Sequence, residues 1–376
     1  MLCLTAYIVF YFIEQVEQMT LNNYFPKSNV DPHGLIIGQG DFTYRVNAKW
    51  GQLNPSITPV ENCHDMVIDS RGRIIMLTDN TKNNFIVYSK DGELLESWGT
   101  EFPGAHSLAL VEENGEEYIY VVDHGWVANR HWDGVSTEDW ASSTNKVIAQ
   151  QGFVSKLTID GRLVFTIGNP MTIGVYEEDM PFRPSDITVA PNGDIYVSDG
   201  YGSDFIIQYN RKGQYIRHWG GKNNQDSRYD LANTHGISID LRNENDPHLI
   251  VSSRADQCLK LFNLDGSYRG RIDTPGAYIH GPVFHGEHFF TPVCWSHIDN
   301  TNADQSGFIS IFDSNNEVVA NLGATAPEYI DGKLQTMTST FDVFKHCHGL
   351  CIDDDGNIYV GQWKAEQSYP IKLERQ

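Results

Sequence analysis

Positive charge is scarce in this sequence of 376 residues. Its 27 Lys and Arg stand against 49 Asp and Glu, which gives a formal net charge of −22. Proteins that bind nucleic acid contact the phosphates with clustered basic side chains, so the composition argues against a nucleic-acid partner. The same deficit argues against an anionic membrane surface. Both kinds of polyanionic partner are therefore disfavoured.

Long apolar segments are also missing. The apolar run Leu2–Ile13 is too short to cross a bilayer, because a membrane-spanning helix needs about 20 residues. No Lys or Arg precedes it and no small-residue cleavage site follows, in contrast to a secretory signal. We therefore expect residues 1–34 to be a leader, partly disordered or an upstream start-site extension, without stable membrane insertion. A cleaved signal peptide is the alternative.

Cysteine is sparse as well. The six cysteines include no Cys-x-x-Cys pair. Cys347 and Cys351 fall in one predicted strand, where residues four apart are about 13 Å apart and cannot form a disulfide. Since no disulfide framework is indicated, we expect a reducing compartment, and a cytoplasmic rather than a secreted protein.

Glycine, in contrast, is abundant with 33 residues, and helical periodicity is scarce, which is typical of short strands joined by turns. One repeated unit reads apolar-x-apolar-Asp-x-x-Gly and continues with apolar residues. It occurs at 66–77, 187–199 and 350–361, with looser copies at 108–123 and 237–253. A second unit alternates around a tight turn and often ends in Trp-Gly; it occurs at 85–99, 154–168, 205–220, 259–272 and 308–323. Each unit predicts a β-hairpin.

Two successive hairpins form a four-stranded antiparallel sheet, and its repetition every 40–50 residues or so is typical of propeller blades. The last repeat lacks a fourth strand, which residues 42–51 would supply. We therefore predict an all-β, six-bladed β-propeller over residues 35–376, a single domain closed by an N-terminal strand. The Trp-rich stretch 124–150 interrupts the second blade and is expected to be a folded lid. The blades should begin near residues 64, 106, 185, 235, 280 and 348.

Histidine recurs at the start of five of these six blades. The first strands of the blades line the central channel, so residues at their starts converge on the axis. Only the third blade differs, with Ser185 and Asp186 at this position. Chance would rarely place so many of the 14 histidines in register. The five are His64, His106, His235, His280 and His348.

Converging neutral imidazoles are the usual form of a transition-metal site. We expect zinc, with iron or copper as the alternatives, and consider a structural calcium ion as a second cofactor. Five imidazoles exceed the needs of tetrahedral zinc, so either some are not ligands or the metal has a higher coordination number. By strand alternation His346 faces the same side as His348, as an additional ligand or a hydrogen-bond donor to one. For Asp186 we favour the role of acceptor of backbone N–H groups over ligation.

The stretch RPSDITVAPNGDIYVSDGY at 183–201 resembles the central blade of the peptidyl-α-hydroxyglycine α-amidating lyases, which are NHL-type six-bladed propellers. Segments 235–240 and 252–262 fit the following blade. The resemblance covers most of the chain at low identity. It implies a zinc ion held by His106, His235 and His348, with Tyr201 as the catalytic base and Arg254 as a contact of the substrate.

The sequence also departs from this family. The first-blade arginine is replaced by LTDN at 77–80, His346 replaces a Met, Gly349 replaces an Asp, and the disulfide cysteines of the family are absent. These changes retain the implied metal site and the tyrosine but alter the substrate pocket.

The resemblance therefore leads us to expect a metal-dependent lyase of the peptidyl-α-hydroxyglycine lyase type, or a related lyase or hydrolase. Its partner would be a small-molecule or peptide-like substrate, hydroxylated and carboxylated; the oligomeric state stays open. One alternative is a propeller that serves as a binding module or scaffold without catalysis. Another is a sugar lactonase or dehydratase, although calcium lactonases use oxygen ligands.

Overall fold

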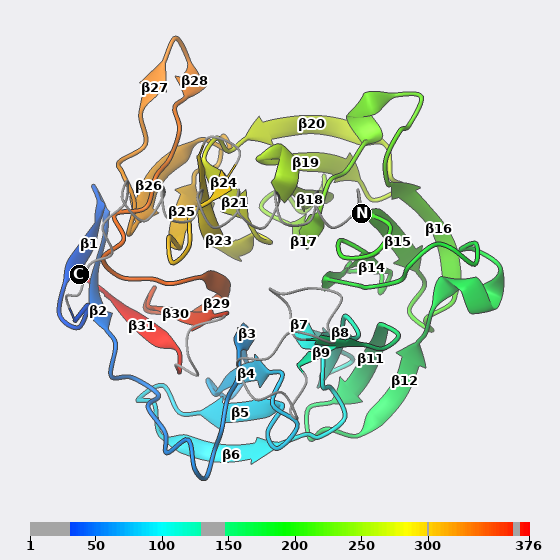
Figure 1. Ribbon diagram of the computed structural model, residues 1–376, viewed down its shortest axis with the longest axis horizontal. Coiled ribbons are helices and arrows are strands. Elements are labelled where there is room, and N and C mark those ends of the chain that lie inside the picture. Colours follow the sequence, from blue (N-terminus) through cyan, green and yellow to red (C-terminus); the bar gives the residue numbers. More distant parts are fainter. Residues whose placement is uncertain (1–30, 129–146, 299–300, 364–368) are drawn as a thin grey trace, which may run out of the picture.

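The structure, a computed structural model, describes residues 31–128, 147–298, 301–363 and 369–376. In these residues six antiparallel sheets surround a central axis like the blades of a propeller (Figure 1). This arrangement confirms the predicted six-bladed β-propeller. Most of the predicted leader, and residues 129–146 of the predicted lid, lie outside the described residues.

The first three blades follow one another along the chain. Blade one contains β3 (Cys63–Ile68), β4 (Ile74–Thr78), β5 (Phe85–Tyr88) and β6 (Leu94–Trp98). Blade two contains β7 (Ala105–Glu113), β8 (Glu116–Asp123), β11 (Phe153–Thr158) and β12 (Leu163–Ile167), with the ribbon β9 (Trp126–Ala128) and β10 (Val147–Ala149) inserted. Blade three contains β13 (Asp186–Val189), β14 (Ile195–Ser198), β15 (Phe205–Tyr209) and β16 (Tyr215–Gly220).

Blades four to six complete the ring. Blade four contains β17 (Thr234–Asp240), β18 (His248–Ser253), β19 (Cys258–Asn263) and β20 (Tyr268–Asp273). Blade five contains β21 (Ala277–Ile279), β23 (His288–Ile298), β25 (Phe308–Phe312) and β26 (Val318–Leu322), with β22 (Val283–His285) and β24 (Thr301–Asn302) also paired to β23. Blade six contains β29 (Cys347–Ile352), β30 (Ile358–Gln362) and β31 (Ile371–Arg375), followed by β2 (Phe42–Asn47) and β1 (Ile36–Gln39).

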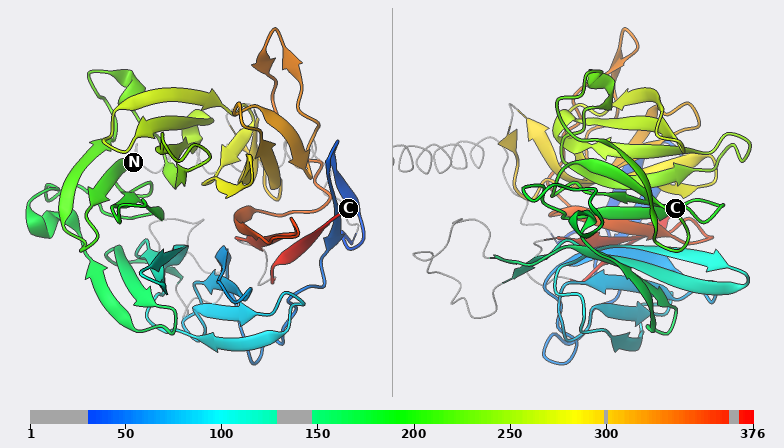
Figure 2. Two further views of the ribbon diagram at one scale, coloured as in Figure 1. Left: turned by 180° about the vertical axis from the view of Figure 1, so that it is seen from behind. Right: turned by 90° about the vertical axis from the view of Figure 1, so that its right-hand side faces the viewer.

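Strands from the two ends of the described chain meet in blade six. β2 pairs antiparallel with β31, with Val46 opposite Leu373, and β29 packs beside β3 of blade one. Figure 2 shows this ring from behind and from the side. Outside the blades lie the hairpin β27 (Tyr329–Ile330) and β28 (Lys333–Leu334) and three 3-10 helices, η1 (Pro170–Ile173), η2 (Ser227–Tyr229) and η3 (Arg254–Asp256).

The repeated Asp-x-x-Gly unit forms the turn between the first two strands of a blade. In blade one, Oδ1 of Asp69 accepts hydrogen bonds from the backbone N–H of Arg71 and Arg73. Gly72 has a φ of 74°, which is the left-handed region that favours glycine. The Asp side chain thus closes the turn and the glycine supplies its backbone conformation.

The Trp-Gly ending of the second unit serves packing between blades. The ring of Trp98 in blade one lies over Gly161 of blade two, where an added Cβ would be 2.8 Å from the indole. Trp219 of blade three lies in the same way over Gly266 of blade four. Together with apolar clusters such as the one that contains Ile75 of blade one and Val121 of blade two, these contacts join neighbouring blades and fix their inner strands around the axis.

Candidate metal centre

Four of the five blade-start histidines are presented by β-bulges. In β3 the register shift leaves His64 without a partner residue in β4, and in β7 it leaves His106 without one in β8. β17 and β29 show register shifts over the segments that contain His235 and His348. Since a bulge re-aims a side chain out of the regular alternation, it allows each imidazole to turn towards the axis.

The five imidazoles converge there, and all are buried. His348 is the common neighbour, because its ring centroid lies within about 5 Å of the other four rings. The separations are 4.8 Å to His64, 4.6 Å to His106, 5.1 Å to His235 and 4.4 Å to His280.

Two sets of three imidazoles have potential ligand atoms within 4.8 Å of one another. One set is His64, His106 and His348; the other is His235, His280 and His348. Neither set is the triad His106, His235 and His348 that the resemblance implies, although the centroids of these three rings lie only 4.6–5.1 Å apart. The structure places His64 and His280 equally close, so that His348 is the member shared by both sets.

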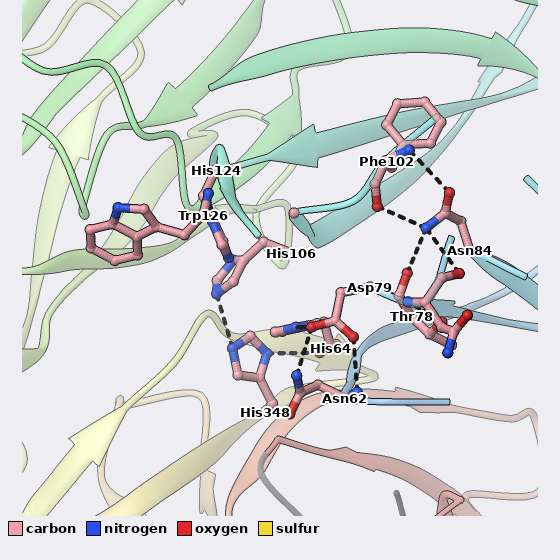
Figure 3. Close-up of polar contacts among 12 residues, drawn as sticks. Asn62, His64, Thr78, Asp79, Asn84, Phe102, His106, His124, Trp126 and His348 are labelled. Atoms are coloured by element: carbon pink, nitrogen blue, oxygen red, sulfur yellow. Dashed lines mark hydrogen bonds and ion pairs between the residues drawn. The ribbon is translucent and has the colours of Figure 1, made fainter. Parts of the chain in front are cut away.

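In two of these rings the Nδ1 nitrogen already forms a hydrogen bond to a backbone carbonyl. Nδ1–H of His106 donates to the carbonyl oxygen of Ser185 at 2.6 Å, and Nδ1–H of His348 donates to that of His64 at 2.8 Å. Each Nε2 therefore carries a lone pair, and the two Nε2 atoms lie 3.0 Å apart (Figure 3). Backbone acceptors of this kind fix the tautomer and orientation of metal-binding histidines.

The donor set fits a metal ion. Nδ1 of His64 and Nε2 of His280 are buried without a hydrogen-bond partner in the described part of the chain. Such nitrogens are costly unless something satisfies them. Burial, and then the nearby imidazoles, lower the pKa of His106 and His348 well below the usual value. These side chains are therefore neutral, the form that coordinates metals. The cluster could hold a metal ion, whose identity the geometry leaves open.

Tyr201 and Arg254 lie beside the histidines. The phenol oxygen of Tyr201 is 2.8 Å from Nε2 of His235 and 3.1 Å from Nε2 of His106. Nη2–H of Arg254 donates to the same phenol oxygen at 3.4 Å, and its guanidinium lies 4.5 Å from the ring centre of Tyr278. Burial raises the pKa of Tyr201, and the charge of Arg254 acts in the opposite direction.

The carboxylate of Asp186 lies farther along the channel. Its Oδ1 accepts from the backbone N–H of Ile187 and its Oδ2 from that of Ile237, each at 2.8 Å. Ser107 also contacts Asp186 and donates to Asp65 at 2.9 Å. This is the acceptor role favoured from the sequence. The group lines a cavity of about 510 Å³. The structural calcium ion that we considered from the sequence stays a prediction without an assigned site.

His346 is placed away from the ring of histidines. Its Nδ1–H donates to the carbonyl oxygen of Trp363 at 3.1 Å, and its Nε2 lies 3.1 Å from Oδ1 of Asp304. It belongs to neither set of candidate ligands among the described residues. The strict alternation from which we placed it beside His348 does not hold across the register shift in β29.

Sequence reasoning missed a second ring of residues, which follow the second strands of the blades. Asp79 follows β4 and lies 3.5 Å from Nε2 of His64; His124 and Trp126 follow β8 (Figure 3). The signal was present, because TDN at 78–80, VDHGW at 122–126 and VSDGY at 197–201 occupy corresponding positions. Of these three segments, only VSDGY was given a chemical role from the sequence, through Tyr201. Asp79 also falls within the segment where the resembled family has an arginine.

Comparison with known proteins supports this resemblance at a distance. No family model matches the chain. It is 34% identical to peptidyl-alpha-hydroxyglycine alpha-amidating lyase 1 of Drosophila melanogaster over 73 residues, 19% of this chain and 13% of that protein. It is 22% identical to a probable peptidyl-alpha-hydroxyglycine alpha-amidating lyase of Caenorhabditis elegans over 266 residues, 70% of this chain and 67% of that protein. The chain thus matches only part of either relative.

Solved structures show the fold alone. A gluconolactonase from Xanthomonas campestris aligns with a TM-score of 0.51 and 11% identity, over 93% of this chain and 97% of that one. A putative glucose dehydrogenase from Thermus thermophilus aligns with a TM-score of 0.50 and 13% identity, over 88% and 99%.

The chain is therefore a six-bladed β-propeller with a buried histidine cluster on its axis. Among named proteins it resembles the amidating lyases distantly. Within the described residues, no helix has the length and apolar character that crossing a membrane requires.

Proposed function

We propose that the protein is a metal-dependent lyase of the peptidyl-α-hydroxyglycine lyase type, or a related lyase or hydrolase acting on a small hydroxylated carboxylate. The observation that carries this proposal is the position of the Tyr201 phenol oxygen, which contacts His235, His106 and Arg254 at once. A phenol, two candidate metal ligands and a guanidinium group thus meet at one point, which supports this proposal. Residues 35–376 would act as one domain.

In this proposal His106, His235 and His348 hold the metal, zinc or alternatively iron or copper, and His64 and His280 complete or orient the ligand set. When bound, the metal supplies Lewis acidity, which lowers the pKa of a hydroxyl group and stabilises the negative charge that develops on its oxygen. The ligands are pre-oriented by backbone carbonyls, as in the bonds of His106 and His348 to Ser185 and His64.

The other residues bind the substrate and move the proton. Arg254 offers a planar guanidinium for the substrate carboxylate, and Tyr278 supports it from one side. Tyr201 in its ionised form takes the proton of the carbinol hydroxyl. The C–O bond of that carbon becomes a C=O bond while its C–N bond breaks. The proton passes to the departing amide nitrogen, so an amide and glyoxylate form and no water is consumed.

Tyr201 needs positive charge nearby to act in this way, because burial raises its pKa. Arg254 supplies one such charge and a bound cation would supply another. The lactonase alternative finds less support, since calcium lactonases use oxygen ligands and the centre offers imidazole nitrogens.

The test is the release of glyoxylate from N-benzoyl-α-hydroxyglycine by the zinc-loaded protein. The wild type should release it, and Tyr201→Phe should be at least about 100-fold slower while it keeps its metal, as expected for the loss of a general base. His285→Asn, a substitution of a histidine outside the cluster, is the control and should match the wild type. Absence of glyoxylate release by a metal-replete wild type would overturn the proposal and favour a binding module.

A further inference from the structure

His124 is a sixth histidine at the centre, and it comes from the second ring of residues. It follows β8 directly, as the segment with Tyr201 follows β14. Its Nδ1 accepts a hydrogen bond from the backbone N–H of Trp126 at 2.9 Å. In the described part of the chain this is the only hydrogen bond of the imidazole. The neutral ring therefore carries its proton on Nε2, where it is available to a ligand.

The position of the ring suggests what that ligand is. The centroid of His124 lies 5.1 Å from that of His106 and 5.5 Å from that of Tyr201. The residue is 9% exposed, and Nε2 is not among the fully buried side-chain atoms that lack a partner in the described residues, so a ligand can reach this N–H. His124 belongs to neither set of candidate metal ligands among the described residues. Its partner is therefore expected to be another group that binds beside Tyr201.

The surrounding contacts hold this ring in place. The ring of Trp126 packs against Tyr201 with centroids 5.1 Å apart. The guanidinium of Arg183 lies 5.2 Å from the Trp126 ring centre and donates to the carbonyl oxygen of His124 at 3.3 Å. The carbonyl group of His124 and the side chain of Trp126 thus both contact residues of the blade-three segment. A donor held in this way loses little conformational entropy when a substrate binds.

We propose that His124 is a substrate-binding residue whose Nε2–H donates a hydrogen bond to an uncharged oxygen of the substrate. The carboxylate of the same substrate is bound by Arg254, which also contacts Tyr201. This inference rests on the proposed function and narrows it. It assigns a contact with His124 to the neutral carbonyl that an N-acyl substrate carries near the reacting carbon.

Two unreactive ligands test this assignment. N-benzoylglycine contains the carbonyl, and 4-phenylbutanoate has the same chain length without it. Calorimetric titration of the zinc-loaded wild type should show N-benzoylglycine binding about tenfold more tightly, the usual effect of one hydrogen bond.

Two variants separate the nitrogens of His124. His124→Asn places an amide near Nδ1, which retains an acceptor for Trp126, and removes the donor at Nε2. It should bind both ligands about equally, with zinc content, melting temperature and affinity for 4-phenylbutanoate unchanged. His124→Gln places an amide N–H near Nε2 and should recover most of the preference. His285→Asn is the matched control.

The outcomes are distinct. A tenfold preference that survives in His124→Asn would overturn this inference and leave the lyase proposal intact. Loss of zinc in His124→Asn would also overturn it, because His124 would then be a metal ligand. If the wild type binds neither ligand and releases no glyoxylate, the proposed function itself is wrong and the inference fails with it.

Discussion

Nε2 of His106 and Nε2 of His348 lie 3.0 Å apart, although each ring already donates its Nδ1–H to a backbone carbonyl. Two lone pairs at that distance repel each other unless a proton or a cation lies close to both. The fold imposes this proximity from residues 242 positions apart in the sequence. A bound cation removes this repulsion, and relief of the repulsion adds to the free energy of metal binding.

Metal binding should therefore depend most strongly on His348. It is the member shared by both candidate ligand sets, so His348→Ala should reduce the metal content per chain to trace amounts. His346→Asn, two residues away but outside the cluster, should retain the metal. Mass spectrometry of the metal in purified protein checks both. Equal metal content in His348→Ala and wild type would contradict this assignment.

Metal removal should also lower the stability of the fold. A ligand that binds only the native state stabilises it by about 2.7 kcal/mol at 100 times its Kd. Dialysis against a chelator should lower the melting temperature, and added zinc should restore it. A melting temperature that is insensitive to both treatments would argue against occupation of the cluster.

Substitution of Arg254 should weaken substrate binding without loss of metal. Lysine keeps the charge but lacks the planar pair of donors that matches a carboxylate. Arg254→Lys should raise KM about tenfold, and Arg254→Ala should raise it further, with kcat changed less in both. A change in kcat alone would show that Arg254 acts on Tyr201 rather than on the substrate carboxylate.

Asp186 should make the protein less stable as pH rises. Burial, reinforced by Asp65, raises the pKa of Asp186 to about 7, whereas an aspartate in an unfolded chain has a pKa of about 3.9. Between about pH 4 and pH 7 the folded state keeps a proton that the unfolded state loses. The free energy of unfolding therefore falls across this window.

Denaturant unfolding at pH 5 and pH 8 measures this fall. Asp186→Asn removes the titrating group and should make the fall smaller than in wild type. The exposed Asp354 provides the control, because Asp354→Asn should leave the fall unchanged. The same pH dependence in Asp186→Asn and wild type would contradict the prediction.

Gly236 should tolerate no side chain. A Cβ added there would lie 2.0 Å from the backbone nitrogen of Gly281 in the neighbouring blade. Gly236→Ala must push two blades apart at the axis, and we expect it to lower the free energy of unfolding by about 2 kcal/mol or more. At Gly270 nothing lies within 4 Å of an added Cβ. Gly270→Ala should therefore be nearly neutral, and equal effects of the two substitutions would contradict the packing argument.

Much of the fold followed from the sequence, because its signals are local. Strand alternation and the turns built on residues such as Asp69 and Gly72 involve neighbours in the chain, and the starts of all six blades were predicted from them. The register of the five blade-start histidines indicated that they converge. Their closeness in the structure agrees with that expectation.

The positions of His346 and His124, in contrast, could not be predicted from local sequence signals. Alternation assumes a regular strand, whereas the register shift in β29 breaks it beside His348. His124 lies at the centre only because the second strands of several blades end close to the same histidine cluster. The sequence of a single repeat cannot predict this arrangement, because the rings next to His124 come from blades one, two and three.

The sequence alone thus determined the type of blade, the number of blades and the presence of histidines at their inner starts. These depend on periodicity and turn chemistry within about 20 residues. The tertiary structure decided which nitrogen atoms face one another and which carboxylates accept hydrogen bonds from a neighbouring blade. It also decided which side chains surround Tyr201. Those relations depend on strand bulges and on contacts between blades, and ring closure brings together residues from opposite ends of the chain.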